Sequence, residues 1–265
     1  MGGRRPDFLI VGAMKGGTTT LYYHLSMHPQ IHLPELKEPE VLVRDASDSD
    51  LLEVYAHHFR GARTNQICGE ASTAYTKRPQ HVGVAERARS LLGRDVKILY
   101  ITRDPVARTL SQYRHERQHG TVSGDFAQAV RSFPQLTDYN RYGWQIAPWK
   151  DAFGAANVME LTLEDYTTHT QARLREVLEF LGVDPELIGP INSELKANSA
   201  EEQKHISNPA LRAVVMSNAY QHYLKPLFPR HLRERVRRTL LPAPKVEKIE
   251  ITPEIREFIL ERSQT

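Results

Sequence analysis

The fold of this chain is decided near its start, by the stretch Phe8-Leu-Ile-Val-Gly-Ala-Met-Lys-Gly-Gly-Thr-Thr-Thr20. Its first part, Phe8–Ala13, is a short apolar run, which is typical of a strand buried inside a parallel sheet. A glycine-rich turn follows, and Thr18–His28 then has helical spacing up to Pro29. Glycines let backbone N–H groups approach an anion closely, and the N-terminus of a helix carries partial positive charge. The stretch therefore predicts a strand–turn–helix site for a phosphate group.

This turn differs from the Walker A loop, which reads G-x-x-x-x-G-K-[ST]. Gly12 and Gly17 have the Walker spacing, but Thr18 stands where the lysine belongs, and Lys15 lies inside the loop instead. Lys15 supplies a mobile charge, and the threonines that follow supply hydroxyl donors. The displaced lysine favours a phosphate ligand other than the usual Mg-nucleoside triphosphate. The alternative is a plain glycine-rich turn with an exposed lysine.

A second candidate site follows the strand that is expected at Val96–Thr102. It reads Arg103-Asp-Pro-Val-Ala-Arg-Thr-Leu-Ser111, and Ser111 lies about two turns along the helix expected at Val106–His119. Ligands gather at the carboxyl ends of parallel strands, so Arg103 and the glycine-rich turn can face one ligand. An arginine with a nearby hydroxyl suits a second phosphate group. The alternative is a strand-end arginine that pairs with Asp104.

Strands alternate with helices through about residue 182. The other elements of this part are expected at Ile67–Ala71 and Val158–Thr162 (strands) and at Ser49–Phe59, Val82–Leu92 and Tyr166–Leu181 (helices). This alternation predicts an α/β fold, a three-layer sandwich with a central parallel sheet of about four to five strands. From about residue 190 the chain is mostly helical, with helices expected at Pro209–Leu224, Phe228–Leu240 and from Thr252 onward. We expect residues 1–265 to form a single domain.

Composition limits the class of protein further. The chain has 265 residues, of which 40% are apolar, and its formal net charge is +3. This charge fits an anionic ligand but is too small to indicate nucleic acid by itself. A lone cysteine, Cys68, excludes an intrachain disulfide and fits a reducing compartment. No run of 18 apolar residues and no signal-peptide core are present, so we expect a cytoplasmic protein without a membrane span.

Together the motifs resemble those of the sulfotransferases that use 3′-phosphoadenylyl sulfate (PAPS). Pro6–Leu21 is similar to the 5′-phosphosulfate loop of that family, and Ile101–Tyr113 is similar to its 3′-phosphate motif. Lys37-Glu-Pro39 resembles the acceptor-side segment of the bacterial and heparan-type branch. The resemblance runs from about Asp7 to about Leu240. It implies a P-loop-like sulfotransferase fold, PAPS as the donor, 3′,5′-adenosine bisphosphate (PAP) as the product, and no metal.

The resemblance also implies a role for each matching residue. Lys15 would contact the oxygen that bridges phosphate and sulfate and would offset the charge that develops there. Arg103 and Ser111 would hold the 3′-phosphate. Glu38 matches the general base that takes the proton of the acceptor hydroxyl during in-line displacement. The 5′-phosphate would be held by Gly16, Gly17, Thr18, Thr19 and Thr20.

The chain departs from this branch in two places. Glu40 replaces the usual histidine, so either Glu38 or Glu40 could be the base; the alternative is that both are solvated loop residues. Heparan-type enzymes often carry a lysine after the glutamate that matches Glu70, and here that position is Ala71. This difference weakens a sulfated polysaccharide as the acceptor. It leaves Glu70 and Tyr75 as candidate residues of the acceptor site, although Glu70 could equally be a residue that supports Lys15.

The sequence thus predicts an enzyme that transfers a sulfuryl group from PAPS to a hydroxyl of a small-molecule, glycan or lipid acceptor, with no nucleic-acid partner. It leaves the acceptor and the oligomeric state open. One alternative is a P-loop small-molecule kinase, which would need a lysine in place of Thr18 and a carboxylate for Mg²⁺, with Asp104 as candidate. The other is a non-catalytic module that binds nucleic acid or another anionic surface through the arginines of Phe228–Leu240. Glu234 interrupts that run, and no aromatic residues are interleaved to stack on bases.

Overall fold

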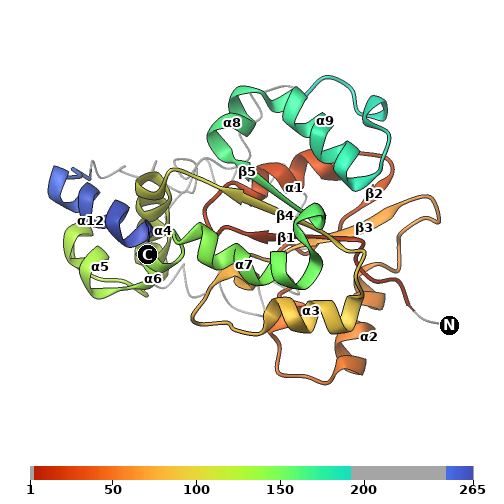
Figure 1. Ribbon diagram of the computed structural model, residues 1–265, viewed down its shortest axis with the longest axis horizontal. Helices are drawn as coiled ribbons and strands as arrows, with labels where there is room; N and C mark the ends of the chain where they lie inside the picture. Colours follow the sequence, from red (N-terminus) through yellow and green to blue (C-terminus); the bar gives the residue numbers. More distant parts are fainter. Residues whose placement is uncertain (1–2, 192–248, 265) are drawn as a thin grey trace, which may run out of the picture. The chain divides into compact units, whose positions relative to one another are not determined.

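The structure of the chain is a computed structural model that describes residues 3–191 and 249–264 (Figure 1). Its centre is a five-stranded sheet in the order β2-β3-β1-β4-β5, in which every pair of neighbours is parallel. The α/β class and the central parallel sheet are therefore confirmed. The strands are Phe8–Gly12 (β1), Ile31–His32 (β2), Ile67–Ala71 (β3), Lys97–Thr102 (β4) and Val158–Thr162 (β5).

Helices follow most of the strands along the chain. The α-helices are Thr18–Ser26 (α1), Asp48–His58 (α2), Val84–Leu92 (α3), Pro105–His119 (α4), Phe126–Ser132 (α5), Gln135–Asp138 (α6), Tyr142–Phe153 (α7), Leu163–Thr168 (α8), Thr170–Leu181 (α9) and Pro253–Gln264 (α12). Short 3-10 turns are formed by Val41–Val43 (η1), Thr73–Thr76 (η2), Ala155–Asn157 (η3) and Pro185–Leu187 (η4).

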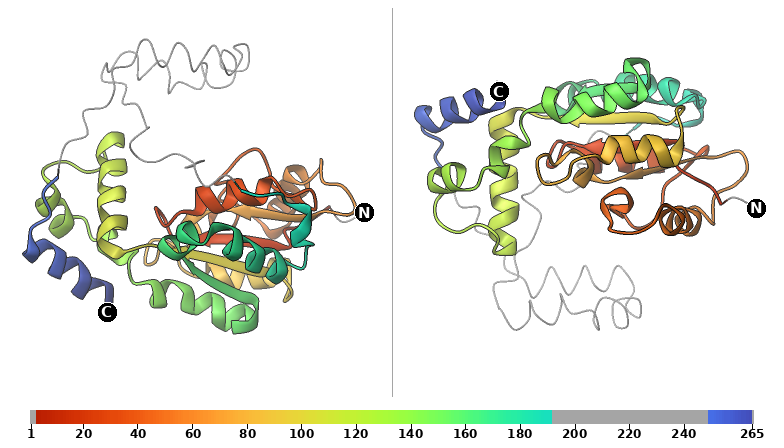
Figure 2. Two further views of the ribbon diagram at one scale, coloured as in Figure 1. Left: turned by 90° about the horizontal axis from the view of Figure 1, so that it is seen from above. Right: turned by 60° about the horizontal axis from the view of Figure 1, so that its bottom comes forward.

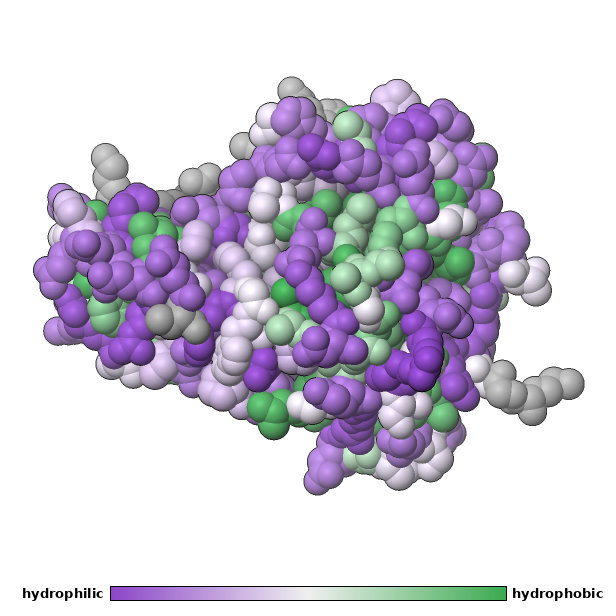
Figure 3. All heavy atoms as spheres, viewed as in Figure 1, coloured by the Kyte–Doolittle hydropathy of each residue, from purple (hydrophilic) through white to green (hydrophobic). Residues whose placement is uncertain are grey.

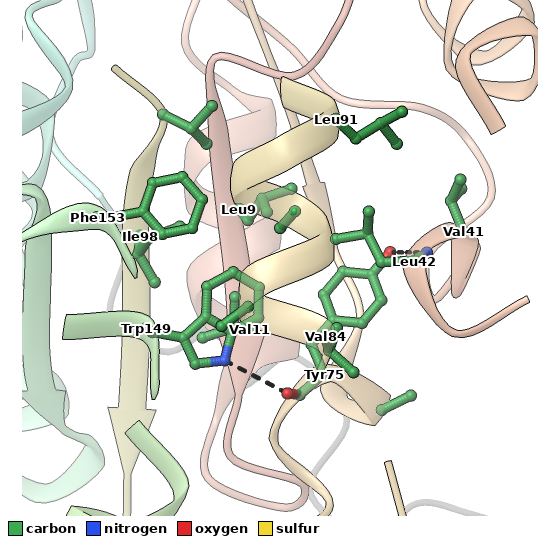
Figure 4. Close-up of a cluster of buried hydrophobic side chains, with 14 of the residues drawn as sticks. Leu9, Val11, Val41, Leu42, Tyr75, Val84, Leu91, Ile98, Trp149 and Phe153 are labelled. Carbon is green, nitrogen blue, oxygen red and sulfur yellow. Dashed lines mark hydrogen bonds between the residues drawn. The ribbon is translucent and has the colours of Figure 1, made fainter. Parts of the chain in front are cut away.

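Both faces of the sheet are covered, because alternate side chains of each strand point to opposite faces. On one face, Leu9 and Val11 of β1 pack with side chains of α2, α3 and α7 (Figure 4). On the other face, Phe8 and Ile10 pack with side chains of α1, α8 and α9. Figures 1 and 2 show these two helical layers on either side of the strands. The three-layer prediction is thus confirmed, and the continuous apolar run of β1 is explained by burial on both faces.

A further group of helices lies beyond the carboxyl end of β4. The helix that follows this strand, α4, contacts α5, α6 and α12, and α12 also contacts α5 and α6 (Figure 2). The helix expected from Thr252 onward is present as α12. On the face drawn in Figure 3, hydrophilic residues make up most of the surface, and apolar residues gather near the middle of the face. In the part of the chain that the structure describes, no helix is both long and apolar enough to cross a membrane.

Several elements differ from the sequence prediction, and helices α5 and α6 were not predicted. Strand β2 has only two residues, too few to show any periodicity. Helix α7 was not predicted, and it contains Pro148, a residue that normally interrupts helices. The helix expected at Tyr166–Leu181 is two helices, since His169 between α8 and α9 has ψ 42°, far from the helical value. The helices expected at Pro209–Leu224 and Phe228–Leu240 lie outside the described residues, so the single-domain prediction stays a prediction.

Candidate active site

The turn between β1 and α1 is folded tightly against β4. The N–H of Ala13 donates to the carbonyl of Ile101 at 2.8 Å, and the N–H of Gly16 donates back to Ala13 at 2.8 Å. A Cβ added to Gly16 would lie 2.3 Å from the Ile101 carbonyl oxygen, which is closer than real Cβ atoms come. Gly17 has φ 108°, a left-handed backbone that glycine adopts without strain. Glycine is therefore required at both positions for this turn to form.

The turn leaves the N-terminus of α1 open to an anion. No side chain caps this helix, and its first turn contains no acidic residue. In the described part of the chain, the first helical N–H that finds a carbonyl is that of Thr20, which donates to Gly17 at 3.0 Å. The preceding N–H groups and the positive end of the helix can bind a phosphate oxygen. Within the predicted stretch Gly16–Thr20, the N–H groups of residues 17–19 are therefore the ones open to a ligand, because those of Gly16 and Thr20 already donate to carbonyls.

Lys15 stands inside this turn and is half-buried. Burial lowers the pKa of its ammonium group, the cations Lys37 and Lys77 lower it further, and Glu116 and Glu38 oppose them. Among residues 3–191 and 249–264, no side chain forms a hydrogen bond or an ion pair with the Lys15 ammonium. The structure therefore brings the predicted phosphate lysine and the predicted base into electrostatic contact, although they are far apart in the sequence.

Arg103 follows the last residue of β4, which is the neighbour of β1 in the sheet. Its backbone carbonyl accepts a hydrogen bond of 2.6 Å from the hydroxyl of Tyr142, while its guanidinium forms no hydrogen bond or ion pair within the described residues. Asp104, the alternative partner of the Arg103 guanidinium, does not pair with it. Its carboxylate instead caps α4 by accepting a hydrogen bond from the N–H of Ala107 at 2.8 Å. Arg103 and the glycine-rich turn thus lie at the ends of adjacent strands. The side chains of Arg103 and Lys15 are both available to a ligand.

Ser111 is carried by α4 and is half-buried. His115, four residues further on and on the same face of this helix, has its pKa lowered to about 4, first by burial and then by the charge of Lys15. The pairing of Ser111 with the donor site stays a prediction. His115 was not among the predicted residues of the site.

Arg108, one turn before Ser111, ties α4 to the glycine-rich turn. Its guanidinium is fully buried and donates to the carbonyl of Met14 at 3.3 Å and to the side chain of Gln112 at 2.8 Å. It also donates to the Leu136 carbonyl at 2.6 Å and to the side chain of Asn140. Burial lowers its pKa, and none of the acceptors in the described chain is a carboxylate. Arg108 therefore holds the backbone of Met14, the residue that precedes Lys15, against α4.

Glu38 is held by donors from two directions. Its Oε2 accepts from the N–H of Thr73 at 2.7 Å and from the Thr73 hydroxyl at 3.1 Å, and its Oε1 accepts from the Lys37 ammonium at 2.5 Å. Its own N–H donates to the carbonyl of Ala71 at the end of β3. These contacts fix the carboxylate near the carboxyl edge of the sheet, on the side where Lys15 also lies.

The backbone singles out three residues. Among the described residues, Lys15, Glu38 and Glu40 are the non-glycine residues with positive φ, at 63°, 60° and 52°. Such angles are uncommon away from glycine and cluster at functional sites. The carboxylate of Glu40 is exposed, while its N–H donates to the Ser72 hydroxyl at 2.9 Å. The structure thus holds the backbone of Glu40, while its carboxylate lacks the hydrogen bonds that hold the carboxylate of Glu38.

Glu70 and Tyr75 lie behind this segment. They are 1% and 2% exposed, and the hydroxyls of Tyr55 and Tyr75 both donate to Glu70 Oε1. Burial is the main cause that raises the pKa of the Glu70 carboxyl to about 7. Glu70 Oε1 has two donors, whereas the buried Oε2 has no hydrogen-bond partner among the described residues. The near-complete burial of both residues favours a packing role over direct contact with an acceptor. Among the described residues no group of histidine, cysteine, aspartate and glutamate side chains could hold a metal ion.

A parallel α/β sheet with an anion-binding turn after its first strand, and cations at the ends of adjacent strands, defines a phosphate-binding α/β protein. The family model described as "Sulfotransferase domain" matches residues 5–243, and the chain belongs to this family. In the crystal structure of a sulfotransferase from Alicyclobacillus acidocaldarius, 88% of that chain matches 74% of this one, with 27% identity and a TM-score of 0.62.

Other sulfotransferases are similar to parts of the chain. It is 35% identical over 116 residues to the membrane-associated sulfotransferase kil1 of Dictyostelium discoideum, which covers 43% of this chain and 23% of kil1. It is 25% identical over 203 residues to the human bifunctional heparan sulfate N-deacetylase/N-sulfotransferase 2, covering 69% of this chain and 22% of that protein. The chain thus spans less than a quarter of the length of these curated relatives. Mouse sulfotransferase SULT7A1, solved in complex with PAP, shares the fold at 18% identity and a TM-score of 0.50, over 98% of this chain and 90% of its own.

Proposed function

We propose that the protein transfers a sulfuryl group from PAPS to a hydroxyl acceptor. The proposal is carried by the joint placement of Lys15, Arg103 and the open N-terminus of α1 at the ends of two adjacent strands. A donor with a phosphosulfate at one end and a 3′-phosphate at the other needs two anion sites of this kind. Family membership supports sulfuryl transfer over other reactions of phosphate-binding folds.

The residues divide the chemistry between them. PAPS supplies an activated sulfuryl group, whose sulfur is attacked by the acceptor oxygen while the bond to the bridging oxygen breaks. The ammonium of Lys15 stabilises the negative charge that develops on that bridging oxygen. Arg103 and Ser111 hold the 3′-phosphate by charge-assisted hydrogen bonds.

Glu38 takes the acceptor proton in this scheme. A carboxylate offers about four acceptor positions, and three are already used by Thr73 and Lys37, so one on Oε1 stays open to an incoming hydroxyl. The charge of Lys15 beside Glu38 supports this assignment. Glu40 is the alternative base, since its carboxylate is exposed and forms no hydrogen bond to any of the described residues.

The acceptor belongs to the proposal only as a class, a hydroxyl on a small molecule, a glycan or a lipid. The names of the relatives point to carbohydrate acceptors for those proteins. Turnover is best sought with a mixed panel of 4-nitrophenol, dodecan-1-ol and chitobiose. A cytoplasmic location and a bacterial origin stay predictions.

The donor site is tested by thermal stabilisation with PAP. We expect PAP to raise the melting temperature of the wild type, and expect Lys15→Ala and Arg103→Ala each to weaken PAP binding by about tenfold or more, because each removes a charge-assisted contact. Lys150→Ala and Arg131→Ala are matched controls, since these cations pair with Glu160 and Glu254 on the surface. Unchanged stabilisation in both site variants would overturn the proposal.

The reaction is tested by release of PAP from PAPS in the presence of the panel. Sulfuryl transfer is the expected result. Phosphoryl transfer from ATP that depends on Mg²⁺, without any use of PAPS, would identify a kinase instead. PAP binding without turnover on any acceptor, water included, would leave a nucleotide-binding protein rather than a transferase. The nucleic-acid alternative rests on Phe228–Leu240, which lies outside the described residues, and steeply salt-dependent binding to DNA would support it.

A further inference from the structure

The segment 38–42, which carries both candidate bases, is bonded almost residue by residue to the stretch that follows β3. It has no regular structure before η1 begins at Val41. Its contacts with residues 71–75 are Glu38 N–H to the Ala71 carbonyl (3.0 Å), Glu40 N–H to the Ser72 hydroxyl (2.9 Å), Thr73 N–H to the Glu38 carboxylate (2.7 Å) and Leu42 N–H to the Tyr75 hydroxyl (3.2 Å).

The last of these contacts continues inward to Glu70. The Tyr75 hydroxyl accepts from the N–H of Leu42 and donates its one proton to Glu70, which lies on β3 (Figure 4 draws the bond to Leu42). All three residues are buried. Because a phenol has a single proton, donation to Glu70 leaves a lone pair directed at Leu42. Glu70 therefore sets the direction of the hydroxyl that anchors the far end of segment 38–42.

We infer that Glu70 and Tyr75 are positioning residues that hold segment 38–42, and with it the Glu38 carboxylate, against the end of β3. The inference rests on the proposed function, in which Glu38 takes the proton of the acceptor. It gives these two residues a part in the reaction that does not require either of them to touch the acceptor.

The strain of the segment explains why an anchor is needed. Glu38 and Glu40 both have left-handed backbone angles, which are unfavourable for residues with a Cβ atom. Such angles persist only when the surroundings over-determine them. Bonds on both sides of these residues supply that constraint, and the bond from Leu42 to Tyr75 closes the segment at its carboxyl end. A loss of this bond lets the segment relax and moves the carboxylate.

Tyr55 offers a matched control for Tyr75. Its hydroxyl donates to the same Glu70 oxygen, at 3.3 Å, and it is as deeply buried, but it comes from α2 and has no described bond to segment 38–42. Tyr55→Phe and Tyr75→Phe thus each remove one hydroxyl that donates to the Glu70 carboxylate. Only Tyr75→Phe also breaks the link to Leu42.

Hydrogen exchange measures the anchor without any acceptor. In Tyr75→Phe we expect the peptide that covers residues 38–43 to exchange about tenfold faster than in the wild type, because the Leu42 N–H loses its acceptor. In Tyr55→Phe we expect little change there. Glu70→Leu should behave like Tyr75→Phe, whereas Glu70→Gln keeps an acceptor oxygen and should restore most of the protection. Equal exchange in the two tyrosine variants would overturn the inference.

Turnover then separates positioning from simple stability. A misplaced catalytic group can lower the rate about a hundredfold, so we expect Tyr75→Phe to slow release of PAP from PAPS roughly ten- to hundredfold. PAP should stabilise this variant as it does the wild type, because the donor site is untouched. Equal turnover in Tyr75→Phe and Tyr55→Phe would overturn this inference and leave the proposed function standing. Failure of the wild type to bind PAP would instead remove the proposed function, and the exchange experiment would still decide whether the anchor exists.

Discussion

Left-handed backbone at Lys15, Glu38 and Glu40 raises the free energy of the folded state by roughly 1–2 kcal/mol per residue compared with glycine. Glycine would relieve this strain, but it would remove an ammonium or a carboxylate. Two of these side chains, those of Lys15 and Glu38, interact electrostatically, and both stand near the edge of the sheet where ligands of parallel α/β proteins bind. At the scale of single residues, the backbone strain is concentrated where charged side chains are needed.

The two glutamates can be separated by substitution. We expect Glu38→Gln to lower turnover about 10²- to 10⁴-fold, the usual contribution of a general base, and to leave stabilisation by PAP intact. Glu40→Gln is the matched control, because its carboxylate is exposed and forms no hydrogen bond within the described chain. The pair is compared by release of PAP from PAPS. Full activity of Glu38→Gln together with a loss in Glu40→Gln would assign the base to Glu40.

Helix α4 connects the donor site to the rest of the molecule. It is capped by Asp104 beside Arg103, its buried Arg108 contacts the glycine-rich turn, and Ser111 lies further along the same helix. Helix α12 packs on α4 through an apolar side that includes Ile255 and Ile259, although it lies beyond the residues that the family model matches. The position of α4, and with it the second anion site, therefore depends on a helix from the far end of the chain.

Ile259 and its neighbour test this dependence on α12. Ile259 is fully buried, while Leu260 next to it is 38% exposed. Truncation of a buried isoleucine to alanine destabilises a protein by about 2–5 kcal/mol, and truncation of an exposed leucine changes stability by less than about 0.5 kcal/mol. We expect Ile259→Ala to lower the melting temperature by about 5 °C or more, at roughly 2–4 °C per kcal/mol, and Leu260→Ala to lower it by little. Equal melting temperatures of the two variants would show that α12 does not support the fold.

Whether a helix or strand could be predicted from the sequence depended on its length and on its pattern of apolar residues. The runs Phe8–Ala13 and Val96–Thr102 predicted β1 and β4 within one residue, because strands buried on both faces are continuously apolar. Pro105 at the first turn of α4 also marked the start of that helix. Strand β2 is too short to carry a pattern, and the break at His169 is a local change of backbone angle within a continuous helical pattern.

For the molecule as a whole, only those residues of the candidate site that belong to a local sequence motif could be predicted. Lys15 and Arg103 follow strands in recognisable turns, so the sequence indicated both. Lys77 lowers the pKa of Lys15, and Lys15 lowers the pKa of His115, only because the fold brings separate segments together. Neither Lys77 nor His115 stands in a motif that predicts this. Tyr75 was a candidate for the wall of the acceptor site or for the core, because a short aromatic segment does not reveal which side of a sheet it packs on. In the structure it is buried and bonded to Glu70.

Glu70 also makes the stability of the whole molecule depend on pH. Its carboxyl is surrounded by Tyr55 and Tyr75, which donate to it, by Glu38 and Arg44, which act through their charges, and by Tyr22. Burial raises its pKa from 4.5 to about 7 despite the two donors. The folded chain therefore binds the proton more tightly than the unfolded chain. The stabilisation that this proton gives is complete below about pH 4.5 and is lost as the pH rises to about 7.

A variant without this titration should show the opposite trend relative to the wild type. Glu70→Gln has nearly the same shape and stays uncharged, so its stability relative to the wild type should increase between pH 5 and pH 8, by on the order of 3 kcal/mol at most. Other buried groups, such as His24 and His115, titrate in both proteins and cancel in the difference. Urea unfolding of both proteins at the two pH values measures this difference directly. A difference that stays constant with pH would show that Glu70 remains in one protonation state across the range, and the stability of the fold would then depend on other groups.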